Sequence, residues 1–165
     1  MRNVLLVSLL FCFSLASGES ERECISLDGA WKIAFDENNK SRNETWYMPK
    51  SFSDIEHLES IDVPSCWETI RKDYEGVAVY GKKFKVPSEW KNKAIRLHFD
   101  AVNYRADVWL NGYAVGQHEG GYGPFEFQVD DLIKVDETNF LSVRVLGPIV
   151  NQDKSEFDKF LELSQ

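Results

Sequence analysis

The chain has 165 residues, enough for one ordinary domain; 43% are hydrophobic and 13% aromatic, which supplies a packed core and excludes general disorder. Its 19 Lys and Arg against 27 Asp and Glu give a formal net charge of −8, and no Lys/Arg cluster interrupts this acidic character, so nucleic acid is excluded as the expected partner. The chain is also too short for a (β/α)₈ barrel enzyme, which needs about 250 residues.

The first 18 residues have the layout of a secretory signal peptide. Arg2 supplies one positive charge, residues 4–16 are almost entirely apolar, and Ala16-Ser17-Gly18 supplies the small residues at which signal peptidase cleaves. The apolar run is shorter than the roughly 20 residues that a membrane span needs. We therefore expect a cleaved signal peptide over 1–18, no membrane span, and a secreted or periplasmic protein with one folded domain over 19–150.

Short runs in which apolar and polar residues alternate predict a series of β-strands. The run over 94–102 is the clearest, with Ile95, Leu97 and Phe99 on one face and polar residues on the other. A helical period appears only over 155–163, within a short C-terminal tail over 151–165. In chain order, the pattern predicts strands over 30–35, 46–48, 61–63, 76–86, 94–102, 125–129 and 141–145, a polar loop over 36–42 and one helical turn over 53–58.

The strongest local signal is Asn111-Gly112, which stands between two apolar runs. Both central residues of a type I′ turn need positive φ, and Asn-Gly tolerates that conformation best, so we expect a tight hairpin over 106–116. Many short alternating strands separated by turns, within one domain, predict an all-β fold, and more specifically an antiparallel β-sandwich.

Motifs that carry catalytic or metal chemistry are sparse. The sequence has no Gly-rich nucleotide loop, no Gly-x-Ser-x-Gly elbow and no Cys/His spacing typical of zinc, so we expect no cofactor and no metal. Cys24 and Cys66 remain after signal cleavage, and the spacing leaves open a disulfide or two buried thiols. Asn39 and Asn43 each begin a glycosylation sequon, which matters only in a host that glycosylates.

The aromatic residues divide into core candidates and contact candidates. Trp31 and Trp109 fall within predicted strands, where large aromatic side chains usually pack in the core. Tyrosines near turns are better placed to stack on a sugar ring; they are Tyr74, Tyr113 and Tyr122. His118 and Glu119, on a turn before Gly120, form either a hydrogen-bonding site or a solvated loop.

Five consecutive segments carry the most specific signal: 63–68 (VPSCWE), 74–80 (YEGVAVY), 96–112 (RLHFDAVNYRADVWLNG), 115–125 (VGQHEGGYGPF) and 139–145 (NFLSVRV). In this order they resemble glycoside hydrolase family 2, which holds β-galactosidases, β-glucuronidases and β-mannosidases. The match runs from about residue 27 to residue 145. The resemblance implies the family's N-terminal sugar-binding domain, a jelly-roll (galactose-binding-like) β-sandwich, here incomplete at its C-terminus.

The resemblance also implies which parts of the enzyme this sequence does not contain. Family members continue into an immunoglobulin-like sandwich and a (β/α)₈ barrel, and two barrel glutamates act as acid/base and nucleophile of a retaining mechanism. No residue of this chain inherits a catalytic role, so the O-glycosyl hydrolase activity on terminal β-glycosidic bonds belongs to the parent protein. We expect this fragment to be inactive alone, with the missing domains and a β-linked carbohydrate as its partners.

Loops of this domain can approach the mouth of the barrel in the family. The resemblance therefore makes Asp73, Tyr74, His118, Glu119 and Tyr122 the candidate substrate-binding residues. Some β-galactosidases place an aspartate where this chain has Gly120, and the loop is more similar to those of glucuronidases and looser galactosidase relatives, so the sugar is left open. The alternative hypothesis is a stand-alone carbohydrate-binding or adhesion module.

Overall fold

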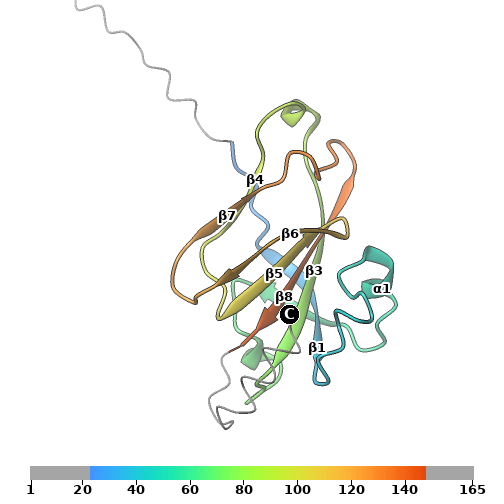
Figure 1. The fold of residues 1–165 in the computed structure, drawn as a ribbon, viewed down its shortest axis with the longest axis vertical. Coiled ribbons are helices and arrows are strands. Elements are labelled where there is room, and N and C mark those ends of the chain that lie inside the picture. Colours follow the sequence, from blue (N-terminus) through green and yellow to red (C-terminus); the bar gives the residue numbers. More distant parts are fainter. Residues whose placement is uncertain (1–22, 148–165) are drawn as a thin grey trace, which may run out of the picture.

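The computed structural model describes residues 23–147, shown in Figure 1. The predicted signal peptide over 1–18 and the tail over 151–165, with its helical pattern over 155–163, lie outside the described residues. Strands dominate the described part, which confirms the expected all-β class. The elements are β1 (Gly29–Asp36), α1 (Pro49–Ser53), β2 (Glu59–Val63), the 3-10 turn η1 (Trp67–Thr69), β3 (Val77–Lys85), the 3-10 turn η2 (Ser88–Trp90), β4 (Arg96–Phe99), β5 (Arg105–Leu110), β6 (Tyr113–Glu119), β7 (Phe125–Gln128) and β8 (Thr138–Leu146).

The strands form two antiparallel sheets that enclose the main core. One sheet has six strands in the order β2-β1-β3-β8-β5-β6, and the other pairs β4 with β7. Alternate residues of β5 and β8 face the smaller sheet, as the period of two along a strand requires. The predicted antiparallel β-sandwich is therefore confirmed. The buried side chains between the sheets are Trp31, Ile33, Ile61, Trp67, Ala78, Val86, Ile95, Leu97, Ala106, Val108, Leu110, Val129, Leu141, Val143 and Val145.

The opposite face of the six-stranded sheet is covered by the segment between β1 and β2, which carries α1 beside the sheet (Figure 1). Phe52 of α1 lies against Phe140 with ring centroids 5.4 Å apart. Gly81 of β3 permits this approach, because a Cβ there would lie 2.5 Å from the Phe52 ring. This second, smaller core consists of Ala34, Trp46, Phe52, Val79 and Phe140.

Two sequence expectations for this covering segment are wrong. Residues 46–48 form a turn and a bend instead of a short strand, and the helical turn is Pro49–Ser53 instead of 53–58. Pro49 occupies the start of α1, where its missing N–H has no helical partner to lose. With only five residues, α1 is too short to show a helical period in the sequence.

The hairpin between β5 and β6 is confirmed. Asn111 and Gly112 have φ of 56° and 87°, the left-handed conformation that a two-residue type I′ turn needs. The Asn111 side chain also ties the turn to the rest of the sheet. Its Nδ2 donates to Leu132 O and Asn139 Oδ1, each at 2.9 Å, and its Oδ1 accepts from Phe140 N at 3.0 Å.

Candidate functional site

The two loops predicted to contact substrate lie at the same end of the six-stranded sheet, because β3 and β5 begin there and β8 and β6 end there. We call residues 73–76, 103–104, 119–122 and 147 the loop end. Backbone hydrogen bonds link them in order: Gly147 N donates to Gly76 O (2.9 Å), Tyr104 N to Leu146 O (3.0 Å) and Gly120 N to Tyr104 O (2.9 Å). The ends of β8 and β5 separate the Asp73–Tyr74 pair from the 118–122 loop.

Tyr74 is held by its own neighbours instead of being presented to a ligand. Its hydroxyl donates to Val77 O at 2.7 Å, and its ring lies edge-on to those of Phe35 and Trp67. Burial, with a further contribution from Asp36, raises the pKa of Tyr74 to about 12. Asp73 beside it is exposed. Of this pair, the Asp73 carboxylate is the group available for contact.

His118 and Glu119 point in different directions, because consecutive residues of β6 face opposite sides. The half-buried His118 ring stacks on Phe125 with centroids 4.1 Å apart, on the side of the smaller sheet. Glu119 is exposed, and its carboxylate near the Tyr104 hydroxyl raises the pKa of Tyr104. Tyr122, at 100% exposure, lies on the loop that follows. The available groups here are therefore Glu119, Tyr104 and Tyr122.

Tyr104 is the loop-end residue that sequence reasoning did not single out. It is 37% exposed and precedes β5, between two predicted strands. The signal that points to it is its place within the family-like segment 96–112, since strand periodicity ends before it.

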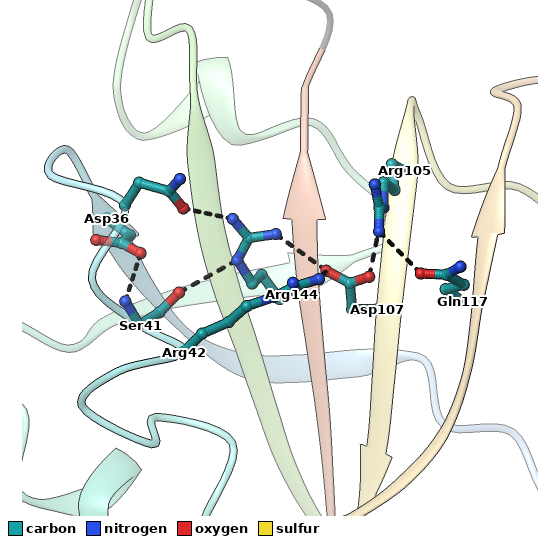
Figure 2. Close-up of polar contacts among 8 residues, drawn as sticks. Asp36, Ser41, Arg42, Arg105, Asp107, Gln117 and Arg144 are labelled. Carbon is teal, nitrogen blue, oxygen red and sulfur yellow. Dashed lines mark hydrogen bonds and ion pairs between the residues drawn. The ribbon is translucent and has the colours of Figure 1, made fainter. Parts of the chain in front are cut away.

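A buried ionic network crosses the outer face of the six-stranded sheet (Figure 2). Arg144 of β8 is 1% exposed, and its Nη1 lies 2.9 Å from Asp107 Oδ2 on β5. Arg42 Nη2 approaches the same oxygen at 2.8 Å, and Arg105 Nε lies 3.4 Å from Asp107 Oδ1. Burial lowers the pKa of Arg144, against the opposing effect of Asp107.

The same network fastens the loop after β1 to the sheet. Arg144 donates from Nε to Ser41 Oγ at 3.3 Å and from Nη2 to Asn39 Oδ1, while Asp36 accepts from the backbone N–H of Lys40 and Ser41, each at 2.8 Å. Because these groups are committed to one another, the arrangement positions a loop and does not present a catalytic site. The sequence pattern does not reveal this network, because Arg144 alternates with apolar residues as an exposed strand residue would.

The sequons and cysteines have distinct surroundings. Asn43 is exposed, whereas the Nδ2 atom of Asn39 is buried and its Oδ1 holds Arg144. Cys24 and Cys66 are both exposed and are not joined by a disulfide. Neither the disulfide nor the buried-thiol alternative therefore describes the structure. Cys24 belongs to the segment before β1, whose Glu23 bonds Lys93, whereas Cys66 lies at the N-cap of η1.

Within residues 23–147, no helix is long and apolar enough to cross a bilayer. Over the same residues, no group of three or more His, Cys, Asp and Glu side chains is arranged to hold a metal ion.

Comparisons with known proteins agree with the fold. The family model described as "Glycosyl hydrolases family 2, sugar binding domain" matches residues 24–157. A β-glucuronidase of Bacteroides fragilis is 33% identical over 142 residues, which cover 82% of this chain and 18% of that protein. A β-galactosidase of Thermoanaerobacter pseudethanolicus is 35% identical over 120 residues, covering 72% of this chain and 14% of the relative.

Among solved structures, the β-glucuronidase from Ruminococcus gnavus in complex with D-glucuronic acid superposes with a TM-score of 0.69 at 30% identity. The match covers 74% of this chain and 21% of that one. The chain thus spans less than a quarter of the length of these relatives.

Proposed function

The chain belongs to glycoside hydrolase family 2, through that family's sugar-binding domain, and we propose that it is the N-terminal part of a secreted β-glycosidase. The parent enzyme hydrolyses terminal β-glycosidic bonds by a retaining mechanism. The observation that carries the proposal is the difference in coverage: one β-glucuronidase matches 82% of this chain with only 18% of its own length. The acid/base and the nucleophile lie in the remaining part of such a protein.

Within that enzyme, the loop end borders the substrate entrance. Glu119, Tyr104 and Tyr122 are exposed there, at the end of the edge strand β6 and at the start of its neighbour β5. A carboxylate accepts hydrogen bonds from sugar hydroxyls, and an exposed tyrosine ring offers an apolar face to a pyranose. The names of the relatives support β-glucuronides and β-galactosides as the two substrate classes to test.

The first experiment measures hydrolysis of nitrophenyl β-D-glucuronide and nitrophenyl β-D-galactoside by the purified 165-residue chain. No turnover above background is expected, since the two catalytic carboxylates lie in other domains. Turnover that disappears when one carboxylate of this chain is replaced would overturn the proposal. In parallel, the coding sequence beyond Gln165 should encode a second sandwich and a barrel with a glutamate pair.

The second experiment tests the loop end in the longer protein. Glu119→Gln and Tyr122→Ala should raise KM for the preferred β-glycoside several-fold, with a smaller effect on kcat, because they remove contacts at the entrance and no reacting group. Glu56→Gln, which changes an exposed carboxylate in the segment after α1, is the matched control. An unchanged KM in both loop-end variants would show that this loop does not contribute to substrate binding.

A further inference from the structure

A hollow lies at the other end of the sandwich, away from the loop end. One side of it is lined by Trp90 at the end of η2 and by residues 92–95 before β4, and the other side by residues 130, 131, 133 and 135 between β7 and β8. Its volume is about 360 Å³, within the roughly 300–1,000 Å³ range of small-molecule pockets. The hydrogen bond from Asn111 to Leu132 places it at the hairpin end of the six-stranded sheet. It is therefore separate from the site of the proposed function.

Part of the pocket wall is apolar and continuous with the main core. Ile95 is buried in that core, and Ile133, Val135 and Trp90 pack against it while also lining the pocket. An indole and three branched aliphatic side chains form a surface against which the C–H face of a pyranose ring can pack.

The rim carries polar groups, some fixed and some available. Asp130 is fixed, because its Oδ1 accepts from Ile95 N at 2.9 Å and its Oδ2 accepts from Gln128 Nε2 at 2.6 Å. Asn92 and Asp131 are exposed and make no side-chain hydrogen bond or ion pair among residues 23–147. An amide and a carboxylate on the rim are therefore available to donate to and accept from a ligand's hydroxyl groups.

The charge of the rim selects against anions. Lys93 is paired with Glu23 at 2.8 Å. The pocket lining thus carries two carboxylates, Asp130 and Asp131, against one ammonium group, Lys93, whose charge is already paired with Glu23. The nearby Arg96 is paired with Glu126. A uronate or a phosphate would meet net negative charge, whereas an uncharged sugar would not.

We propose that this pocket binds one neutral pyranose unit, with its C–H face on the apolar wall at Trp90 and Ile95 and its hydroxyls on Asn92 and Asp131. This site makes the domain a sugar-binding module in its own right, with a preference opposite to that expected of a glucuronide site. A methyl pyranoside has few heavy atoms, so at the ligand efficiency of ordinary small ligands Kd is on the order of 1 mM.

The test follows the tryptophan indole N–H signals of the ¹⁵N-labelled 165-residue chain by NMR, with the Trp90 signal assigned from Trp90→Phe. Titration with methyl β-D-galactopyranoside or methyl β-D-glucopyranoside should shift that signal with saturation. Methyl β-D-glucuronide should bind at least about tenfold more weakly, which corresponds to about 1.4 kcal/mol of charge repulsion.

Two rim variants and one control complete the design. Asp131→Ala and Asn92→Gly should each weaken binding of the neutral sugar several-fold; glycine is chosen because Asn92 has a positive φ of 64°. Asp62→Ala, which changes an exposed carboxylate on β2, should leave binding unchanged. No shift at about 100 mM sugar, far above the expected Kd, would overturn the proposal. So would equal binding of the glucuronide, or shifts confined to the loop end, which would leave the proposed function intact.

Discussion

Arg144 is the largest of the fully buried side chains in residues 23–147, and its guanidinium group donates hydrogen bonds to three other side chains. Asp107 supplies a carboxylate, and Asn39 and Ser41 supply neutral oxygens from the loop after β1. Burying a charge is costly, but removing one partner of a buried pair costs more, because the other charge then stays uncompensated. The hydrogen bonds of Arg144 therefore hold the loop after β1 against the six-stranded sheet.

Asp107→Ala should lower the free energy of unfolding by about 3–5 kcal/mol, because the Arg144 and Arg42 guanidinium groups lose their shared carboxylate. Arg96→Ala, which breaks an ion pair that is 55% and 36% exposed, is the control and should cost about 1 kcal/mol or less. Urea denaturation followed by tryptophan fluorescence measures both. Asp107→Asn should fall between them, and equal losses for Asp107→Ala and Arg96→Ala would contradict the role given to the network.

Among the elements, the β5–β6 hairpin depends most directly on two residues. Gly112→Val places a β-branched residue at φ 87°, and its Cβ would lie 2.5 Å from Met48 Sδ. The backbone conformation costs on the order of 1–2 kcal/mol, so the melting temperature should fall by roughly 3–8 °C. Gly123→Ala is the matched control, since nothing lies within 4 Å of its Cβ position and its φ is not positive. A melting temperature unchanged by Gly112→Val would argue against this account of the turn.

The β4–β7 pair has a pH-dependent contact on its outer face. His98 lies 3.1 Å from Glu126 Oε1 and 3.1 Å from Asp100 Oδ1, and these hydrogen bonds, that of Glu126 first, raise the pKa of His98 above 6.5. His98 in turn lowers the pKa of Glu126 below 4.5. The stabilisation is therefore complete below pH 6.5 and is lost as pH rises through the raised pKa. At the acid end it is present above pH 4.5 and is lost as pH falls through the lowered pKa of Glu126.

The difference in melting temperature between the unchanged chain and His98→Gln should consequently be largest between pH 4.5 and 6.5 and shrink above neutrality. Differential scanning calorimetry across this range measures it. In a Glu126→Gln background the same substitution should show a much weaker pH dependence. A difference that grows towards alkaline pH would have the wrong sign for this contact.

The strands could be predicted from the sequence because their periodicity and turn chemistry are local. The alternation around Ile95 and Leu97 predicts β4, and Asn111-Gly112 predicts the hairpin turn, from neighbouring residues alone. The covering segment could not be predicted in this way, since Phe52 is buried by a distant strand and not by a pattern around it. The burial of Arg144 could not be predicted for the same reason, because it is the covering segment that buries this face of β8.

At the loop end, the sequence predicted that the candidate residues lie in loops or at strand ends, but not the orientation of every side chain there. The 118–122 loop does present Glu119 and Tyr122 at an exposed end of the sheet. Tyr74 was expected to face a ligand, yet its hydroxyl is bonded to Val77 O and its ring to neighbouring aromatic rings. Composition near a turn does not show which way a tyrosine points, because that depends on packing between elements distant in sequence.

For the whole molecule, the two sheets differ greatly in how well they are supported. β3 and β8 pair over nine residues in the middle of the six-stranded sheet, whereas β4 and β7 pair over four residues with no further strand in the described part of the chain. Amide hydrogens of β3, β8 and β5 should therefore exchange at least about tenfold more slowly than those of β4 and β7. Hydrogen exchange with mass spectrometry measures this, and uniform protection of both sheets would contradict it.

The place of β8 also bears on how the protein is made. It is the last described strand to be synthesised, yet it lies between β3 and β5. Without residues 138–146, β3 and β5 would each lack the neighbour that β8 provides, and an unpaired strand edge can pair with a strand of another chain. β8 is thus the strand that connects the two groups β2-β1-β3 and β5-β6: a polypeptide that stops before residue 138 lacks it, and the six-stranded sheet cannot close until residue 146 has been synthesised.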